Sequence, residues 1–155
     1  MGSLIDTSVL IATERAERFT EWCRQQLELL TASTYVSPMV LSELRVGVAA
    51  ATLSDLAVAR QKTLTRALSL ECLPITQDTA LLHAQISTEV KSLGNVRVRT
   101  HDLWLAATAI EHDLTLLTCN SRDFADIRGL KFTAPRTNPT TPNGDNACAP
   151  PLIFC

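Results

Sequence analysis

The chain has 155 residues, of which 46% are hydrophobic and 19% charged, proportions typical of one compact domain with a substantial core. Its net charge of −2 excludes a polycation, so any nucleic-acid contact requires a local basic patch. We expect no signal peptide, because the first residues lack a basic lead and a long apolar run, and no membrane segment. The five cysteines are odd in number and lack CxxC spacing, which argues against a disulfide framework or zinc site and favours a reducing cytoplasm.

Short β-prone runs alternate with helical patterns along the chain. The predicted strands cover residues 3–5, 34–36, 71–75, 114–118 and 130–133. Helices are predicted between them, including an amphipathic helix that contains Phe19, Trp22, Cys23, Leu27 and Leu30. This alternation favours one α/β domain over residues 1–133, with three α/β/α layers and a mainly parallel central sheet. Residues 134–155 are rich in Pro, Asn and Thr without periodicity, and we expect a tail without regular structure.

Several helix starts carry recognisable capping residues. Ser37 followed by Pro38 predicts one start, and Thr76 and Thr100 are expected to cap two others. The helix that follows Thr100 is apolar on nearly all sides, which indicates a buried position. The helix over residues 53–68 is amphipathic, and we expect its Arg60 to face solvent.

Acidic residues stand at the predicted strand ends and helix starts. Asp6 ends the first strand, Asp102 lies in the first turn of the buried helix, Asp123 follows the fourth strand, and Glu43 lies on the helix after the second strand. In a parallel sheet these positions meet at one edge, where clustered carboxylates repel one another unless a cation is present. Magnesium prefers such oxygen ligands, and the resulting site can activate water and hold a phosphate. The alternative is ordinary helix capping by the aspartates and a solvated Glu43.

Four stretches carry a resemblance to a known family: LIDTSVLI, SPMVLSELRVG, THDLWLAATAIEHDLTLLTCNSRDF and the closing GLKF strand. In this order they resemble the PIN domain family, particularly VapC toxins of bacterial toxin–antitoxin pairs, over about residues 1–133. The resemblance implies an endoribonuclease that depends on Mg²⁺ or Mn²⁺. Asp6, Glu43 and Asp102 match the first three acidic positions of the family.

The fourth acidic position has two candidates in this chain. Many relatives carry Asp where this chain has Asn120, and others have an acid three residues later, so we choose Asp123 as the ligand and Asn120 as a supporting residue. Further supporting residues implied by the resemblance are Thr7, Ser8 and Thr118. Three basic residues flank the acids in sequence and are candidates for RNA contacts, with solvated loop positions as the alternative: Arg97, Arg99 and Arg122. Asp126 is expected to be a surface residue.

Family resemblance also implies partners. A VapC-like toxin is expected to form a homodimer in the cytoplasm and to be silenced by a cognate antitoxin protein. Haloacid-dehalogenase-like phosphatases and receiver domains need a second acid near the first strand, and this chain has Ser8 two residues after Asp6. The remaining alternative is a non-catalytic PIN-fold module that binds RNA or protein, against which the retained acidic positions argue.

Overall fold

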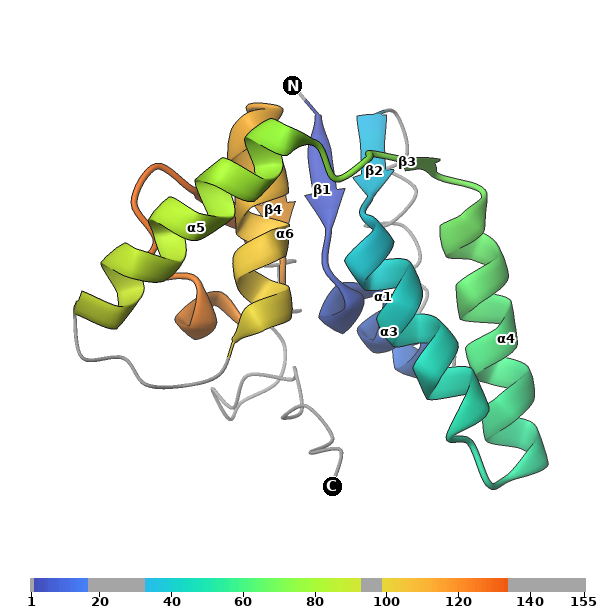
Figure 1. Ribbon diagram of the computed structural model, residues 1–155. Coiled ribbons are helices and arrows are strands. Elements are labelled where there is room, and N and C mark those ends of the chain that lie inside the picture. Colours follow the sequence, from blue (N-terminus) through green and yellow to red (C-terminus); the bar gives the residue numbers. More distant parts are fainter. Residues whose placement is uncertain (1, 17–32, 93–98, 134–155) are drawn as a thin grey trace, which may run out of the picture.

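The computed structural model describes residues 2–16, 33–92 and 99–133 (Figure 1). Its strands are β1 (Ser3–Ile5), β2 (Thr34–Val36), β3 (Glu71–Cys72), β4 (Thr115–Leu117) and β5 (Lys131–Thr133). Its helices are α1 (Thr7–Ala16), α3 (Pro38–Ala49), α4 (Ser54–Leu68), α5 (Gln77–Ser92) and α6 (Thr100–Glu111), and a short 3-10 helix, η2, covers Ser121–Asp123. The helix predicted around Trp22 and the predicted tail from Ala134 lie outside the described residues.

All strands join one parallel sheet in the order β3-β2-β1-β4-β5. From β1 the chain builds one half of the sheet through β2 and β3, and then returns past β1 to add β4 and β5. Because parallel crossovers are right-handed, this reversal sends the helices of the two halves to opposite faces of the sheet. The predicted α/β class with a parallel central sheet is confirmed. The boundary between the halves, between β1 and β4, is where such folds bind ligands beyond the strand ends.

The core lies between this sheet and its helices. Leu4 of β1 and Leu116 of β4 pair directly in the register and are fully buried. Helix α6 packs along α5, as α3 packs along α4 (Figure 1). The fully buried Ala106, Ala107 and Ala109 of α6 lack bulky side chains, which permits the close packing that an apolar helix of this kind requires.

Strand ends differ from the prediction by one to three residues. The third strand stops at Cys72 rather than residue 75, because Pro74 has no amide hydrogen to continue the ladder. One further bond, from Leu73 N to Val36 O at 2.9 Å, follows the strand. The fourth and fifth strands are also shorter than predicted, covering Thr115–Leu117 and Lys131–Thr133.

Helix starts are predicted correctly in two of three cases. Ser37 accepts a hydrogen bond from Val40 N at the start of α3. Thr76 and Thr79 cap α5 reciprocally, each hydroxyl accepting the other residue's amide, at 3.1 and 2.9 Å. Thr100 is instead the first helical residue of α6, and the preceding Arg99 takes the cap position without a side-chain capping bond.

Helix α4 contradicts the expected orientation of its arginine. Arg60 is buried, and its Nε lies 3.1 Å from Glu14 Oε1 of α1. Thr63 Oγ1 donates to the other oxygen of Glu14 at 2.8 Å. The prediction that Arg60 faces solvent is therefore wrong. Its charge is neutralised by a carboxylate on another helix rather than stabilised by water.

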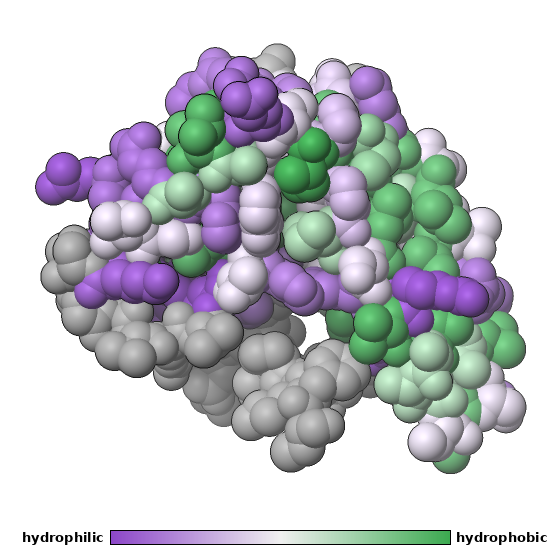
Figure 2. Space-filling model, in the orientation of Figure 1, coloured by the Kyte–Doolittle hydropathy of each residue, from purple (hydrophilic) through white to green (hydrophobic). Residues whose placement is uncertain are grey.

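Exposed apolar side chains gather over α3, α4 and their connection. Of the large hydrophobic residues exposed within the described chain, Val46, Leu53, Val58 and Leu68 belong to this helix pair, and Leu81 lies on α5. Figure 2 shows apolar surface concentrated on the side of the molecule formed by α3 and α4. We call Val46, Leu53, Val58 and Leu68 the α3–α4 apolar surface. No described helix combines the length and apolar character needed to cross a membrane.

Candidate acidic site at the carboxyl edge of the sheet

Asp6 directly follows β1 and is only 7% exposed. Its Oδ2 accepts hydrogen bonds from Ser8 Oγ at 2.5 Å and from Thr118 Oγ1 at 2.7 Å. Its amide donates to Leu117 O at 2.9 Å, which extends the pairing of β1 with β4. Burial raises the pKa of Asp6, the two hydroxyl hydrogen bonds oppose that rise, and the charge of Glu43 adds to it. The two hydroxyl groups therefore hold Asp6 in place, while burial disfavours its ionised form.

The two hydroxyl groups also organise the loop after β4. Ser8 Oγ accepts the amide hydrogen of Cys119 at 3.0 Å, and Thr118 Oγ1 accepts that of Asn120 at 2.9 Å. The structure thus brings Ser8 and Thr118 onto Asp6, while Asn120 meets this network through its backbone. Cys119 is disulfide-bonded, although the number and spacing of the cysteines argue against a disulfide framework.

Glu43 reaches the same region from α3 and has partners at both oxygens. Thr7 Oγ1 donates to its Oε2 at 2.5 Å, and His101 Nδ1 lies 2.7 Å from its Oε1. Thr7 belongs to the first turn of α1 and His101 to the first turn of α6, so this carboxylate joins three helices. The contact of His101 with Glu43 is not predictable from local sequence, because the two residues are 58 positions apart.

The pKa of Asp102 is raised by its surroundings, which include the other three candidate acids. Its pKa is raised to about 7, first by burial and then by the negative charges of Asp6, Asp123 and Glu43, while Arg99 lowers it. Because all three other candidate acids contribute, the four carboxylates share one electrostatic environment. Sequence-distant acids are therefore gathered at the carboxyl edge of the sheet, as the strand and helix pattern predicts.

Asp123 lies in η2, and its surroundings correct two expectations. Arg99 is 8% exposed and pairs with both oxygens of Asp126, with Nη1 to Oδ1 at 3.1 Å and Nη2 to Oδ2 at 2.8 Å. The Nη1 group also donates to the backbone carbonyl of Asp123. Asp126 is thus an ion-pair partner rather than a plain surface residue, and Arg99 is a buried ion-pair residue rather than a solvated loop arginine. Of the other predicted basic residues, Arg122 is exposed in η2 and Arg97 lies outside the described residues.

The carboxylates have the chemistry of a site for a hard divalent cation. Within residues 2–16, 33–92 and 99–133, no three Asp, Glu, His or Cys side chains already stand in a metal-binding group. Magnesium, however, is usually held by one or two carboxylates with the rest of its shell made of water. The raised pKa values of Asp6 and Asp102 record burial and repulsion that a bound cation would offset. This donor set fits Mg²⁺ or Mn²⁺ with several retained waters.

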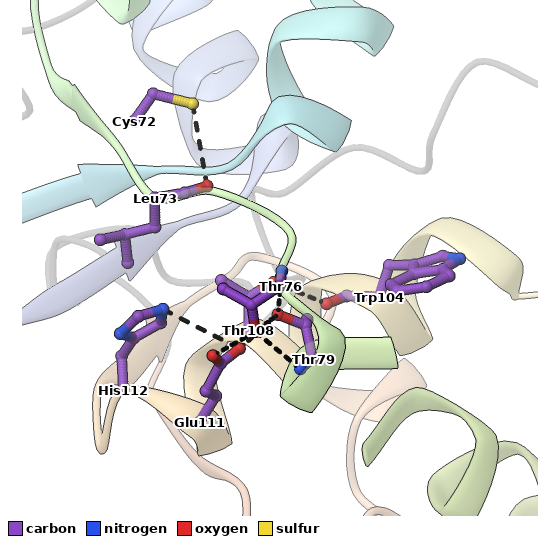
Figure 3. Close-up of polar contacts among 8 residues, drawn as sticks. All are labelled: Cys72, Leu73, Thr76, Thr79, Trp104, Thr108, Glu111 and His112. Atoms are coloured by element: carbon purple, nitrogen blue, oxygen red, sulfur yellow. Dashed lines mark hydrogen bonds and ion pairs between the residues drawn. The ribbon is translucent and has the colours of Figure 1, made fainter. Parts of the chain in front are cut away.

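A second polar cluster, centred on the single carboxylate of Glu111, lies at the other end of α6 (Figure 3). Glu111 accepts hydrogen bonds from Thr76, at 2.6 Å, and from Thr79, and the ring of His112 lies 3.9 Å away. Burial alone would raise the pKa of Glu111, but the two hydroxyl hydrogen bonds and His112 lower it overall. Because these hydroxyls also cap α5, Glu111 fastens the start of that helix to the end of α6.

Comparison with known proteins relates the chain to one protein family and to named relatives. The sequence model of the family described as PIN domain matches residues 3–130. Ribonuclease VapC5 of Mycobacterium tuberculosis is 36% identical over 128 residues, which cover 83% of this chain and 89% of that protein. Ribonuclease VapC1 of Rickettsia felis is 34% identical over 133 residues, covering 84% and 94%.

Solved structures give the same fold. The structure of VapBC-5 from Mycobacterium tuberculosis, a member of the VapBC family of toxin–antitoxin systems, superposes with a TM-score of 0.69 at 31% identity. It is matched over 88% of this chain and 98% of that one. The VapBC2 structure from Rickettsia felis, bound to a DNA fragment from its promoter, gives a TM-score of 0.73 at 25% identity, covering 86% and 98%.

Proposed function

Because the chain belongs to the PIN domain family, we propose that it is a metal-dependent endoribonuclease and the toxin of a toxin–antitoxin pair. The observation that carries the proposal is the shared environment of four acids, in which Asp6, Glu43 and Asp123 help raise the pKa of Asp102 to about 7. A surface that only bound RNA would not need negative charge gathered beside a phosphate backbone. The names of the ribonuclease relatives support the same reaction.

Each acid has a role in this proposal. Asp6 and Asp102 are the central ligands of Mg²⁺ or Mn²⁺, because Asp6 is buried at the end of β1 and Asp102, half-buried in the first turn of α6, feels its charge. Glu43 and Asp123 complete the acidic site, with water filling the remaining positions. When bound, the cation supplies charge neutralisation for the phosphodiester and an activated water.

Other residues of the chain hold these acids and meet the substrate. Ser8 and Thr118 orient Asp6 through its Oδ2, and Thr7 orients Glu43 through its Oε2. Asn120 supports the loop between β4 and η2. Arg122, exposed beside Asp123, is the described basic residue best situated to contact an RNA phosphate.

RNA cleavage by purified protein with Mg²⁺ or Mn²⁺ tests the proposal. We expect cleavage by the parent, loss of cleavage in Asp6→Asn and Asp102→Asn, and parental activity in Asp113→Asn. Asp113 is a suitable control because it is exposed, pairs only with Lys131 among the contacts described, and has a φ of 50°, which asparagine tolerates. RNA binding without cleavage, unchanged by metal, would instead favour the non-catalytic binding module.

For the partner, we propose an antitoxin whose apolar segment covers the α3–α4 apolar surface. This surface exposes Val46 at 55% and Leu53 at 68%, more apolar side chain than the adjacent helices present. Co-expression with the protein encoded beside this chain should give a stable complex, and Val58→Asp should weaken it, while Gln85→Asp at an exposed position of α5 should not. We further propose that the free toxin is a homodimer and acts in the cytoplasm. Light scattering of the purified chain tests whether it is a dimer.

A further inference from the structure

Arg99 connects two segments that carry acids of the proposed site. It immediately precedes α6, three residues before Asp102, and its side chain is only 7% exposed. Its guanidinium binds Asp126 through two parallel hydrogen bonds, a geometry that fixes orientation as well as distance. The same guanidinium donates from Nη1 to the carbonyl oxygen of Asp123.

These contacts act on the backbone of Asp123 rather than on its carboxylate. Residues 121–123 form a single 3-10 turn, in which Asp123 N donates to Asn120 O at 2.9 Å. The fully buried Phe124 anchors the far side of this turn in the core. Arg99 therefore supplies a rigid link between the turn and the start of α6, two elements that do not pair through the sheet.

We propose that Arg99 is a positioning residue for the acidic site, and that Asp126 holds it in the orientation this role requires. By fixing the Asp123 backbone to the start of α6, the pair sets the separation between Asp123 and Asp102. The inference deepens the proposed function, since its catalytic consequence rests on that function, whereas its consequence for cation binding can be measured without RNA.

Two other roles for Arg99 make different predictions. A phosphate contact would require accessible donor groups, but the side chain is buried and both terminal nitrogens are engaged. A purely stabilising ion pair would affect unfolding and leave cation affinity and turnover unchanged. The buried pair of Arg60 and Glu14 provides the matched control, because it also joins an arginine to a carboxylate at low exposure but lies outside the acidic site.

The test compares Arg99→Lys, Asp126→Asn and Arg60→Lys in the full chain. Lysine keeps the charge but cannot make two parallel bonds to a carboxylate while also reaching the Asp123 carbonyl. Calorimetry with Mn²⁺, thermal melting, and kcat and KM for RNA cleavage are measured for each protein. We expect Arg99→Lys to weaken Mn²⁺ binding and lower kcat by about 10- to 100-fold, the usual effect of losing a residue that orients metal ligands. KM should change much less.

Asp126→Asn should shift the same quantities in the same direction by a smaller factor, because the amide retains one acceptor oxygen. Arg60→Lys should lower the melting temperature and leave Mn²⁺ affinity and kcat near the values of the parent.

Equal Mn²⁺ affinity and kcat in Arg99→Lys and the parent would overturn the proposal. A rise confined to KM would also overturn it, because that result indicates a phosphate contact. A parent that binds Mn²⁺, with binding weakened by Arg99→Lys, but cleaves no RNA would overturn only the proposed function. A parent that binds no Mn²⁺ would overturn both.

Discussion

Thr118 Oγ1 donates a 2.7 Å hydrogen bond to Asp6 Oδ2, and this bond joins the ends of two neighbouring strands that are 112 residues apart in sequence. Thr118 is fully buried, so no water replaces the bond when the hydroxyl is removed. Thr118→Val should therefore lower the free energy of unfolding by about 1–3 kcal/mol, the usual cost of a lost bond to a charged or buried group.

The same variant should also weaken Mn²⁺ binding, because Asp6 loses one of the two hydroxyl groups that orient it. Calorimetry and urea unfolding measure the two effects. Thr118→Ser is the control, since it keeps the hydroxyl and loses only a buried methyl group. Similar Mn²⁺ affinities for the Val and Ser variants would contradict an orienting role for the hydroxyl.

Asp102 makes the stability of the metal-free protein depend on pH. Its pKa is about 7 in the folded chain against an ordinary value of 3.8, so between these values the folded state holds a proton that the unfolded state has released. The folded state then binds more protons, and stability falls as pH rises from about 4 to 7. Below this window the carboxyl group is protonated in both states and imposes no penalty.

Asp102→Asn removes this penalty. Metal-free melting temperatures of parent and variant should be similar near pH 4, and the variant should melt higher at pH 8. Mg²⁺ should raise the melting temperature of the parent much more than that of the variant. A constant difference between the two proteins across the pH range would contradict the raised pKa.

The pair of Arg60 and Glu14 should be important for stability. Arg60→Met leaves Glu14 as a buried carboxylate with 9% side-chain exposure, which should cost about 3–5 kcal/mol of unfolding free energy. The exposed pair of Lys131 and Asp113 is the comparison, and Lys131→Met should cost about 0–1 kcal/mol. Urea unfolding measures the loss of unfolding free energy in each variant. Equal losses would show that Arg60→Met does not leave Glu14 as an unpaired buried charge.

Gly47 is buried where α3 meets the guanidinium of Arg60, and a Cβ added there would lie 2.7 Å from Arg60 Nη1. In an open helix, replacing glycine by alanine is usually favourable by about 1 kcal/mol. Gly47→Ala should instead lower the melting temperature, because Arg60 must move away from Glu14. In an Arg60→Met background the same substitution should be less harmful, and an equal loss in both backgrounds would exclude this contact as the cause.

Local signals account for what the sequence predicts well. Asp6 follows a short apolar strand and Asp102 opens an apolar helix, so the topology of a parallel sheet is enough to bring them to one edge. Arg60 and Arg99 were misjudged for the opposite reason. Their partners lie 46 and 27 residues away, respectively, and an arginine that pairs inside the fold has the same local pattern as one in water. The contact between His101 and Glu43 could not be predicted for the same reason, since the two residues are 58 positions apart.

The parallel sheet also determines the order in which the site can assemble. Every strand pair is parallel, so none can form as a local hairpin, and each must wait for the crossover between its strands. The central pair, β1 with β4, needs residues up to Leu117, and Asp123 follows still later. A growing chain on the ribosome therefore carries Asp6 and Glu43 long before it can place Asp102 and Asp123 beside them. The proposed ribonuclease would become competent only when nearly all of this domain has been synthesised, so a nascent chain that ends before η2 carries an incomplete acidic site.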